Sequence, residues 1–231
     1  RELKRQLPHE SIVYIGDSAR APYGPRPAGQ IREYTWQLVK FLLTKDVKMI
    51  VIACNTATSA ACKIMRGMYP DLPLVGIEPA VKPAAQNHRG EKVAVMATPL
   101  TLHEEKFKQL VKRYENLATI IPVPCPDLVE YVEKGILEGP ELEGYLKDVL
   151  TPCLQEGVKA VVLGCTHFPL VKAAIGKVVG ESVRIYDGGE GTARQAKCLL
   201  AAKNLCTDQE KGHICFESSA PEKEAYYEAL Y

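Results

Sequence analysis

Short apolar runs alternate along this sequence with longer stretches of helical periodicity, and this alternation limits the fold more than any other feature. We expect buried strands at residues 12–15, 48–53, 93–96, 160–163 and 183–186. Continuous apolar runs are typical of parallel strands that are covered on both faces. The spacing predicts helices over residues 27–45 and from Thr98 through residue 111. Such regular alternation indicates an α/β fold with mainly parallel sheets.

Two of the apolar runs end in the same way, which predicts two similar lobes. Residues 49–56 read MIVIACNT, and residues 160–167 read AVVLGCTH. A strand–cysteine unit that occurs once in each half suggests that each lobe is a mainly parallel sheet flanked by helices. We place one lobe at residues 1–78 plus 188–231 and the other at residues 79–187. Because ligands bind beyond the carboxyl ends of parallel strands, we expect the active site in the cleft between the lobes.

Cys54 and Cys165 would then stand on opposite walls of that cleft, each with a helix expected to begin directly after it. A helix N-terminus favours thiolate and binds carboxylates. Two thiols on opposite sides of one molecule fit a specific reaction, in which one removes a proton from carbon and the other delivers a proton to the opposite face. His167 can tune or relay the proton of Cys165, although a hydrogen-bonded structural histidine is the competing interpretation.

Composition excludes several other classes of protein. Lys and Arg number 29 against 28 Asp and Glu, so no basic face for nucleic acid is expected. No apolar run reaches the roughly 18 residues of a membrane span. The eight cysteines form no CxxC pair, which favours reduced, buried thiols in a cytosolic protein. Cysteines and histidines show no zinc spacing, and the glycine-rich residues 187–192 predict a turn into the last long helix rather than a nucleotide site.

Five sequence blocks resemble those of the glutamate racemases, in the aspartate/glutamate racemase superfamily. Four of them are YIGDSARAPYG at residues 14–24, CNTA at 54–57, GIEP at 76–79 and GCTHFPL at 164–170. The fifth consists of Ala97 and Thr98, followed by Thr101. Their order and spacing match over nearly the whole chain. The resemblance implies cofactor-independent interconversion of L- and D-glutamate in the cytoplasm. That activity would supply D-glutamate for peptidoglycan synthesis, and hence for cell-wall biogenesis and cell shape.

The resemblance also implies roles for individual residues. Cys54 would take the α-proton from D-glutamate and Cys165 from L-glutamate, while His167 and Glu133 would assist Cys165. The substrate contacts that it implies are Tyr23, Gly24, Asn55, Thr56, Thr98, Thr101, Thr166 and His167.

Simpler structural roles compete at three of these places. Glu133 also fits a solvated helix face, and Thr98 also fits a helix cap without further function. Tyr23 and Gly24 lie in a Pro-Tyr-Gly-Pro sequence that favours a turn.

One departure from the family concerns the start of the chain. The family opens with a strand that ends in Asp-Ser-Gly, whose Asp assists the thiol on the Cys54 side and whose Ser binds substrate. This chain starts after that segment, and Asp17 belongs to a different block. We therefore expect a central strand and a catalytic helper to be missing, and the segment 216–231 also looks shortened or divergent.

Three alternatives remain open at this point. A related racemase acting on aspartate or another amino acid would share both cysteines. A Cys-His hydrolase or transferase would use Cys165 and His167 without needing Cys54. A truncated, non-catalytic fragment would bind an acidic metabolite or a partner without turnover. The expected partner is the small-molecule substrate glutamate, with no metal, nucleic acid or membrane, and with a homodimer as the assembly to test.

Overall fold

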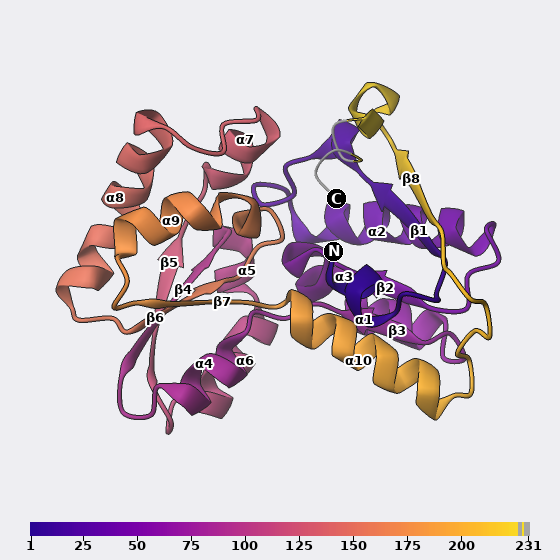
Figure 1. The fold of residues 1–231 in the computed structure, drawn as a ribbon, viewed down its shortest axis with the longest axis horizontal. Helices are drawn as coiled ribbons and strands as arrows, with labels where there is room; N and C mark the ends of the chain where they lie inside the picture. Colours follow the sequence, from indigo (N-terminus) through magenta and orange to yellow (C-terminus); the bar gives the residue numbers. More distant parts are fainter. Residues whose placement is uncertain (226–227, 229–231) are drawn as a thin grey trace.

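The computed structural model describes residues 1–225 and 228, and it confirms the α/β fold of parallel sheets flanked by helices. Two lobes lie side by side in Figure 1. One contains a four-stranded parallel sheet in the order β5-β4-β6-β7. Its strands are β4 (Lys92–Ala97), β5 (Thr119–Pro124), β6 (Ala160–Leu163) and β7 (Arg184–Asp187).

The inner strand β4 shows why the sequence runs are continuously apolar. Ala94 and Met96 join the hydrophobic core on one face of the sheet, whereas Val93 and Val95 join the core on the other. All four are fully buried. The helices of the first core are α7 (Leu128–Glu133), α8 (Pro140–Gln155) and α9 (Lys172–Val179), and those of the second are α4 (Val81–Asn87) and α6 (Glu105–Tyr114). Both faces are therefore covered, as expected for parallel strands.

The other lobe contains two separate pairs of parallel strands within the described residues. β1 (Ile12–Gly16) pairs with β8 (Ile214–Ser218), and β2 (Ile50–Ile52) pairs with β3 (Leu74–Gly76). The helices of this lobe are α1 (Glu2–Gln6), α2 (Ala28–Leu43), α3 (Asn55–Met68) and α10 (Gly189–Ala202). The first and last strands of the described chain thus lie side by side (Figure 1).

The helix expected from Thr98 is divided into two. α5 (Pro99–His103) ends before Glu104, whose extended backbone separates it from α6. Thr98 caps α5, because its hydroxyl accepts a hydrogen bond from the Thr101 amide at 3.4 Å. The capping role proposed for Thr98 is therefore confirmed, although the helix that it caps is shorter than expected.

The chain passes between the lobes in two adjacent places. The first connection follows β3 and contains Ile77 and Glu78, and the second is at Gly188, after β7. A Cβ atom on Gly188 would lie 2.4 Å from the carbonyl oxygen of Glu78 and 3.2 Å from a side-chain carbon of Ile77. This contact brings the two connections together, while the lobe boundaries at residues 78/79 and 187/188 remain a prediction.

We expect Gly188→Ala to reduce the free energy of unfolding by about 1–3 kcal/mol, because one connection must move to relieve the overlap. Gly191→Ala, in the first turn of α10, is the matched control, since its Cβ would meet no atom within 4 Å. There alanine should stabilise the helix by about 0.5–1 kcal/mol. Urea denaturation of both variants measures the difference. Equal stabilisation by both alanines would show that the two connections are not in close contact.

Candidate active site

Cys54 lies two residues beyond β2 and is the N-cap of α3. Its sulfur accepts a hydrogen bond from the Ala57 amide at 3.4 Å, in the place where a cap oxygen usually acts. The sulfur is therefore held at the positive end of the helix. Burial and the charge of Cys165 raise the pKa of Cys54 to about 11, against the opposing effect of the Ala57 and Thr56 amides and the Thr56 hydroxyl.

The charge of Cys165 acts on Cys54 even though the two residues belong to different lobes. The two sulfurs therefore share one electrostatic environment. Both cysteines follow a parallel strand at the same distance, Cys54 after β2 and Cys165 after β6. That they face each other across a cleft remains a prediction.

Cys165 differs from Cys54 in its local structure, and the helix expected directly after it is not there. A 3₁₀ turn (Phe168–Val171) follows instead, and α9 begins only at Lys172. Pro169 explains the difference, because proline lacks an N–H group and disfavours the α conformation in the residue before it. The expectation that a helix N-terminus acts on Cys165 is therefore wrong.

His167 lies beside Cys165 instead. Its Nδ1 is 3.8 Å from the Cys165 sulfur, and its Nε2 is 2.8 Å from Oε1 of Glu133, at the end of α7. Burial lowers the pKa of His167, but the hydrogen bonds with Cys165 and Glu133 outweigh it and raise the pKa to about 10. An imidazolium has an N–H group on both ring nitrogens, so it can donate to the Cys165 sulfur and to Glu133 at once.

Glu133 is consequently not a solvated helix residue. Its side chain is 14% exposed and is paired with His167. The two paired residues are 34 positions apart in the sequence, and the role of Glu133 as an acidic helper remains a prediction.

Three threonine hydroxyls join the lobes close to Cys54. Thr56, at the start of α3, lies 3.1 Å from both Thr98 and Thr101, whose hydroxyls are 3.0 Å apart. All three residues are at most 3% exposed. Thr98 is thus both a helix cap and a member of this hydroxyl triangle, and Thr56 also donates to the sulfur of Cys54.

Asn55 carries an unsatisfied acceptor next to Cys54. Its residue is 4% exposed, and its Oδ1 has no hydrogen-bond partner among the described residues. A buried polar atom without a partner costs about 1–3 kcal/mol. A ligand that supplies an N–H donor, such as an ammonium group, would remove this cost. Thr166, partly buried, occupies the corresponding position after Cys165.

Tyr23 and Gly24 extend from the first lobe to the second. Arg26 donates its amide to the Tyr23 carbonyl at 3.1 Å, so the segment is a turn, as its composition favours. A Cβ on Gly24 would lie 3.1 Å from Cβ of Thr98, so the turn packs closely on the threonine triangle. The Tyr23 hydroxyl donates to the carboxylate of Asp17, for which the sequence pattern predicts no role.

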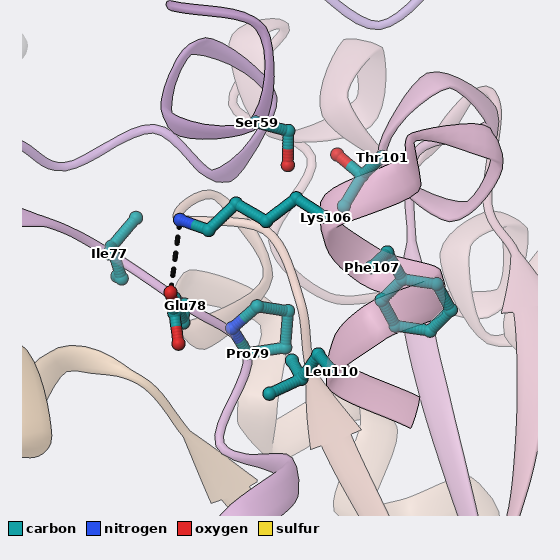
Figure 2. Close-up of a pocket in the computed structure, with 8 residues that line it drawn as sticks. All are labelled: Ser59, Ile77, Glu78, Pro79, Thr101, Lys106, Phe107 and Leu110. Atoms are coloured by element: carbon teal, nitrogen blue, oxygen red, sulfur yellow. Dashed lines mark ion pairs between the residues drawn. The ribbon is translucent and has the colours of Figure 1, made fainter. Parts of the chain in front are cut away.

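A small pocket adjoins this group of residues at the first connection between the lobes. Lys106 and Glu78 form an ion pair of 3.0 Å within it (Figure 2). Thr101 lines the pocket, whereas Cys54 and Cys165 do not. The pocket is therefore a neighbour of the candidate active site and not the site itself.

The other cysteines play no part in this arrangement. All eight cysteines are free thiols, but Cys198, Cys206 and Cys215 are exposed, contrary to the expectation of buried thiols. Cys198 is exposed because Ala193, Ala196 and Leu200 form the buried face of α10. In the part of the chain that the structure describes, no group of three His, Cys, Asp or Glu residues could hold a metal ion. The described helices also include none that is both long and apolar enough to cross a bilayer.

Comparison with known proteins identifies the family of this chain. The Asp/Glu/Hydantoin racemase family model matches residues 1–196. The glutamate racemase of Clostridium novyi (strain NT) is 46% identical over 215 residues, which cover 93% of this chain and 83% of that protein. Two solved glutamate racemases have a TM-score of 0.85. The one from Francisella tularensis, in complex with D-glutamate, is 29% identical over 99% of this chain and 86% of its own. The one from Escherichia coli, in complex with L-glutamate and the activator UDP-MurNAc-ala, is 28% identical over 99% and 87%. This chain therefore belongs to the Asp/Glu/Hydantoin racemase family.

Proposed function

We propose that this protein interconverts L- and D-glutamate without a cofactor, using Cys54 and Cys165 as two bases on opposite faces of the substrate. The observation that carries the proposal is the pair of strand-end thiols in one electrostatic environment, one capping α3 and the other held by His167 and Glu133. The names of the relatives support glutamate as the substrate, as do the D- and L-glutamate bound in two solved neighbours.

The reaction from L-glutamate begins at Cys165. Its thiolate, paired with the imidazolium of His167, takes the α-proton, and the electron pair of the broken C–H bond stays on Cα. The thiol of Cys54 then gives its proton to the opposite face of Cα, which yields D-glutamate and leaves a thiolate at Cys54. The reverse reaction uses the same two groups in exchanged roles, so atoms and charge balance in both directions.

The raised pKa values of Cys54 and His167 suit the first of these directions. Because the pKa of Cys54 is raised to about 11, this thiol holds a proton at neutral pH and is ready to act as the acid. His167, with a pKa of about 10, is cationic at the same pH and supports negative charge on Cys165. Hydrogen bonds that strengthen as carbanion character develops supply the remaining stabilisation.

Substrate binding would use the polar groups around Cys54. We propose that Oδ1 of Asn55 accepts a hydrogen bond from the substrate ammonium, because this buried oxygen is otherwise unsatisfied. The substrate carboxylates would lie against amides at the start of α3, which suit an anion, and against hydroxyl donors. The hydroxyl donors are Thr56, Thr98, Thr101 and Thr166, and Tyr23, Gly24 and His167 complete the predicted contacts.

Turnover of L-glutamate in D₂O tests the two-base reaction. We expect the D-glutamate formed to carry deuterium at Cα, because its proton comes from a thiol that exchanges with solvent. Proton NMR and mass spectrometry measure the incorporation. Product that keeps the original hydrogen would contradict two bases and indicate transfer by one group. Aspartate run in parallel is the substrate control, and equal exchange on aspartate would favour the broader amino-acid racemase.

The wider role is also a proposal. Membership of the family supports cytoplasmic supply of D-glutamate for peptidoglycan, and a homodimer is the assembly to test by sedimentation. We also propose the lobe division at residues 1–78 plus 188–231 and residues 79–187.

A second candidate function is a hydrolase, because Cys165, His167 and Glu133 are arranged like the nucleophile, base and orienting acid of such an enzyme. Such an enzyme would not need Cys54.

A further inference from the structure

Asp17 is a buried carboxylate that the proposed reaction does not use. It directly follows β1, and its side chain is only 6% exposed. The Tyr23 hydroxyl donates to one carboxylate oxygen, and Nε of Arg20 donates to the other at 2.8 Å. A carboxylate so enclosed requires its donors, so Asp17 fixes the positions of both side chains.

The ion pair of Asp17 and Arg20 also fastens this loop to α2. Arg20 Nη1 donates to the side chain of Gln37 at 2.6 Å, and the guanidinium carbon lies 4.2 Å from the ring centre of Tyr34. Stacking of this kind holds a guanidinium in one orientation. Arg26 adds a hydrogen bond from its Nε to the Arg20 carbonyl at 2.8 Å. The loop is therefore anchored from residue 17 through residue 26.

The anchored loop carries the segment that reaches the other lobe. Tyr23 packs against the core that includes α3, and its ring centre is 6.0 Å from that of Tyr34. Burial and the hydrogen bond to Asp17 raise the pKa of the Tyr23 phenol, so the phenol stays neutral and keeps its proton, which it donates in the hydrogen bond to Asp17. The next residue, Gly24, packs on Thr98.

We propose that Asp17 is a positioning residue for substrate binding, whose carboxylate holds Tyr23 and Arg20 so that the Tyr23–Gly24 turn rests against Thr98 of the opposite lobe. This inference rests on the proposed function, in which Tyr23 and Gly24 contact glutamate. A carboxylate suits the position because both of its oxygens accept. An asparagine would place an N–H group against one of the two donors.

The test compares Asp17→Asn, Tyr23→Phe and the double variant. We expect Asp17→Asn to raise KM for both enantiomers about tenfold with kcat changed less than about threefold, which is the signature of lost binding in both ground and transition states. Tyr23→Phe removes the same hydrogen bond from its other end. The double variant should therefore be no worse than Asp17→Asn, because coupled residues are not additive.

Glu33→Gln is the matched control. Glu33 is an exposed carboxylate on α2 that accepts from Gln37 at 2.9 Å, so its loss should leave KM unchanged. Calorimetry measures the Kd values for L- and D-glutamate without any turnover. If the wild type does not racemise glutamate, the proposed function fails, but the Kd values still test the role of Asp17 in binding. If Asp17→Asn does not fold, Tyr23→Phe tests the same hydrogen bond, because it keeps the Asp17–Arg20 ion pair. Additive effects in the double variant, or unchanged Kd values in folded Tyr23→Phe, would overturn the proposal.

Discussion

Cys54→Ala and Cys165→Ala should each abolish racemisation of glutamate in both directions, because neither thiol can serve both faces of Cα. Loss of one general acid/base costs roughly 10²–10⁴-fold, and more is expected here because the opposite face has no substitute. Circular dichroism of the product follows the reaction. Cys198→Ala, which removes an exposed thiol on α10, is the control that should remain active.

The serine variants separate chemistry from folding. Cys54→Ala also removes the N-cap acceptor of α3, which should cost about 0.5–2 kcal/mol of stability. Cys54→Ser restores that acceptor, but a hydroxyl is a far weaker acid than a thiol and should support only a trace of activity. Both alanine variants should still bind glutamate. Near-normal racemisation by Cys54→Ala alongside an inactive Cys165→Ala would instead indicate a one-base or Cys-His mechanism.

His167→Asn should lower kcat/KM by about 10²-fold or more, because a neutral amide replaces the cation beside Cys165. The effect should be the same for L- and D-glutamate, since the equilibrium constant of racemisation is one. The loss should be smaller at high pH, where a thiolate forms without help from a cation. An equal loss at every pH would contradict the proposed role of the imidazolium.

Glu133→Gln should weaken the imidazolium beside Cys165 without removing His167. Glutamine keeps an acceptor for Nε2 of His167 but removes the negative charge, so the pKa of His167 should fall below about 10. The cationic form is then lost at lower pH, and activity should decline earlier on the alkaline side, with about a tenfold loss of kcat near that limit. Glu130→Gln, an exposed residue on the same helix, is the control for which the pH profile should not move.

The sequence predicts the fold best where burial is complete. The apolar run of β4 fills both cores, so its pattern identifies a parallel strand directly. β5 was not predicted, because Pro122 and Pro124 interrupt its pattern, and only its place at the edge of the sheet makes them acceptable. β3 and β8 were also not predicted. β3 is only three residues long, and the partner of β8 lies at the far end of the sequence.

The sequence predicts the residues of the candidate site that belong to a local pattern, but not the contacts between distant segments. The repeated strand–cysteine unit is local, so it identifies Cys54 and Cys165 without further information. The pairing of His167 with Glu133 joins distant segments, and the family resemblance implies only that both residues assist Cys165. The role of Asp17 depends on two hydrogen-bond donors, Arg20 and Tyr23, that meet at its carboxylate in the folded chain. Their presence in one sequence block, residues 14–24, is the signal that could have indicated this contact.

The pairing of the first strand with the last one also affects how the chain can fold as it is synthesised. β1 forms its hydrogen bonds with β8, in a register that joins Ile12 to Ile214. The four strands of the other lobe all lie between these two points in the sequence. Since domains fold as units while the ribosome extends the chain, the lobe encoded in the middle has its complete sheet first. β1 is synthesised before these strands, but it cannot pair with β8 until residues 214–218 leave the ribosome.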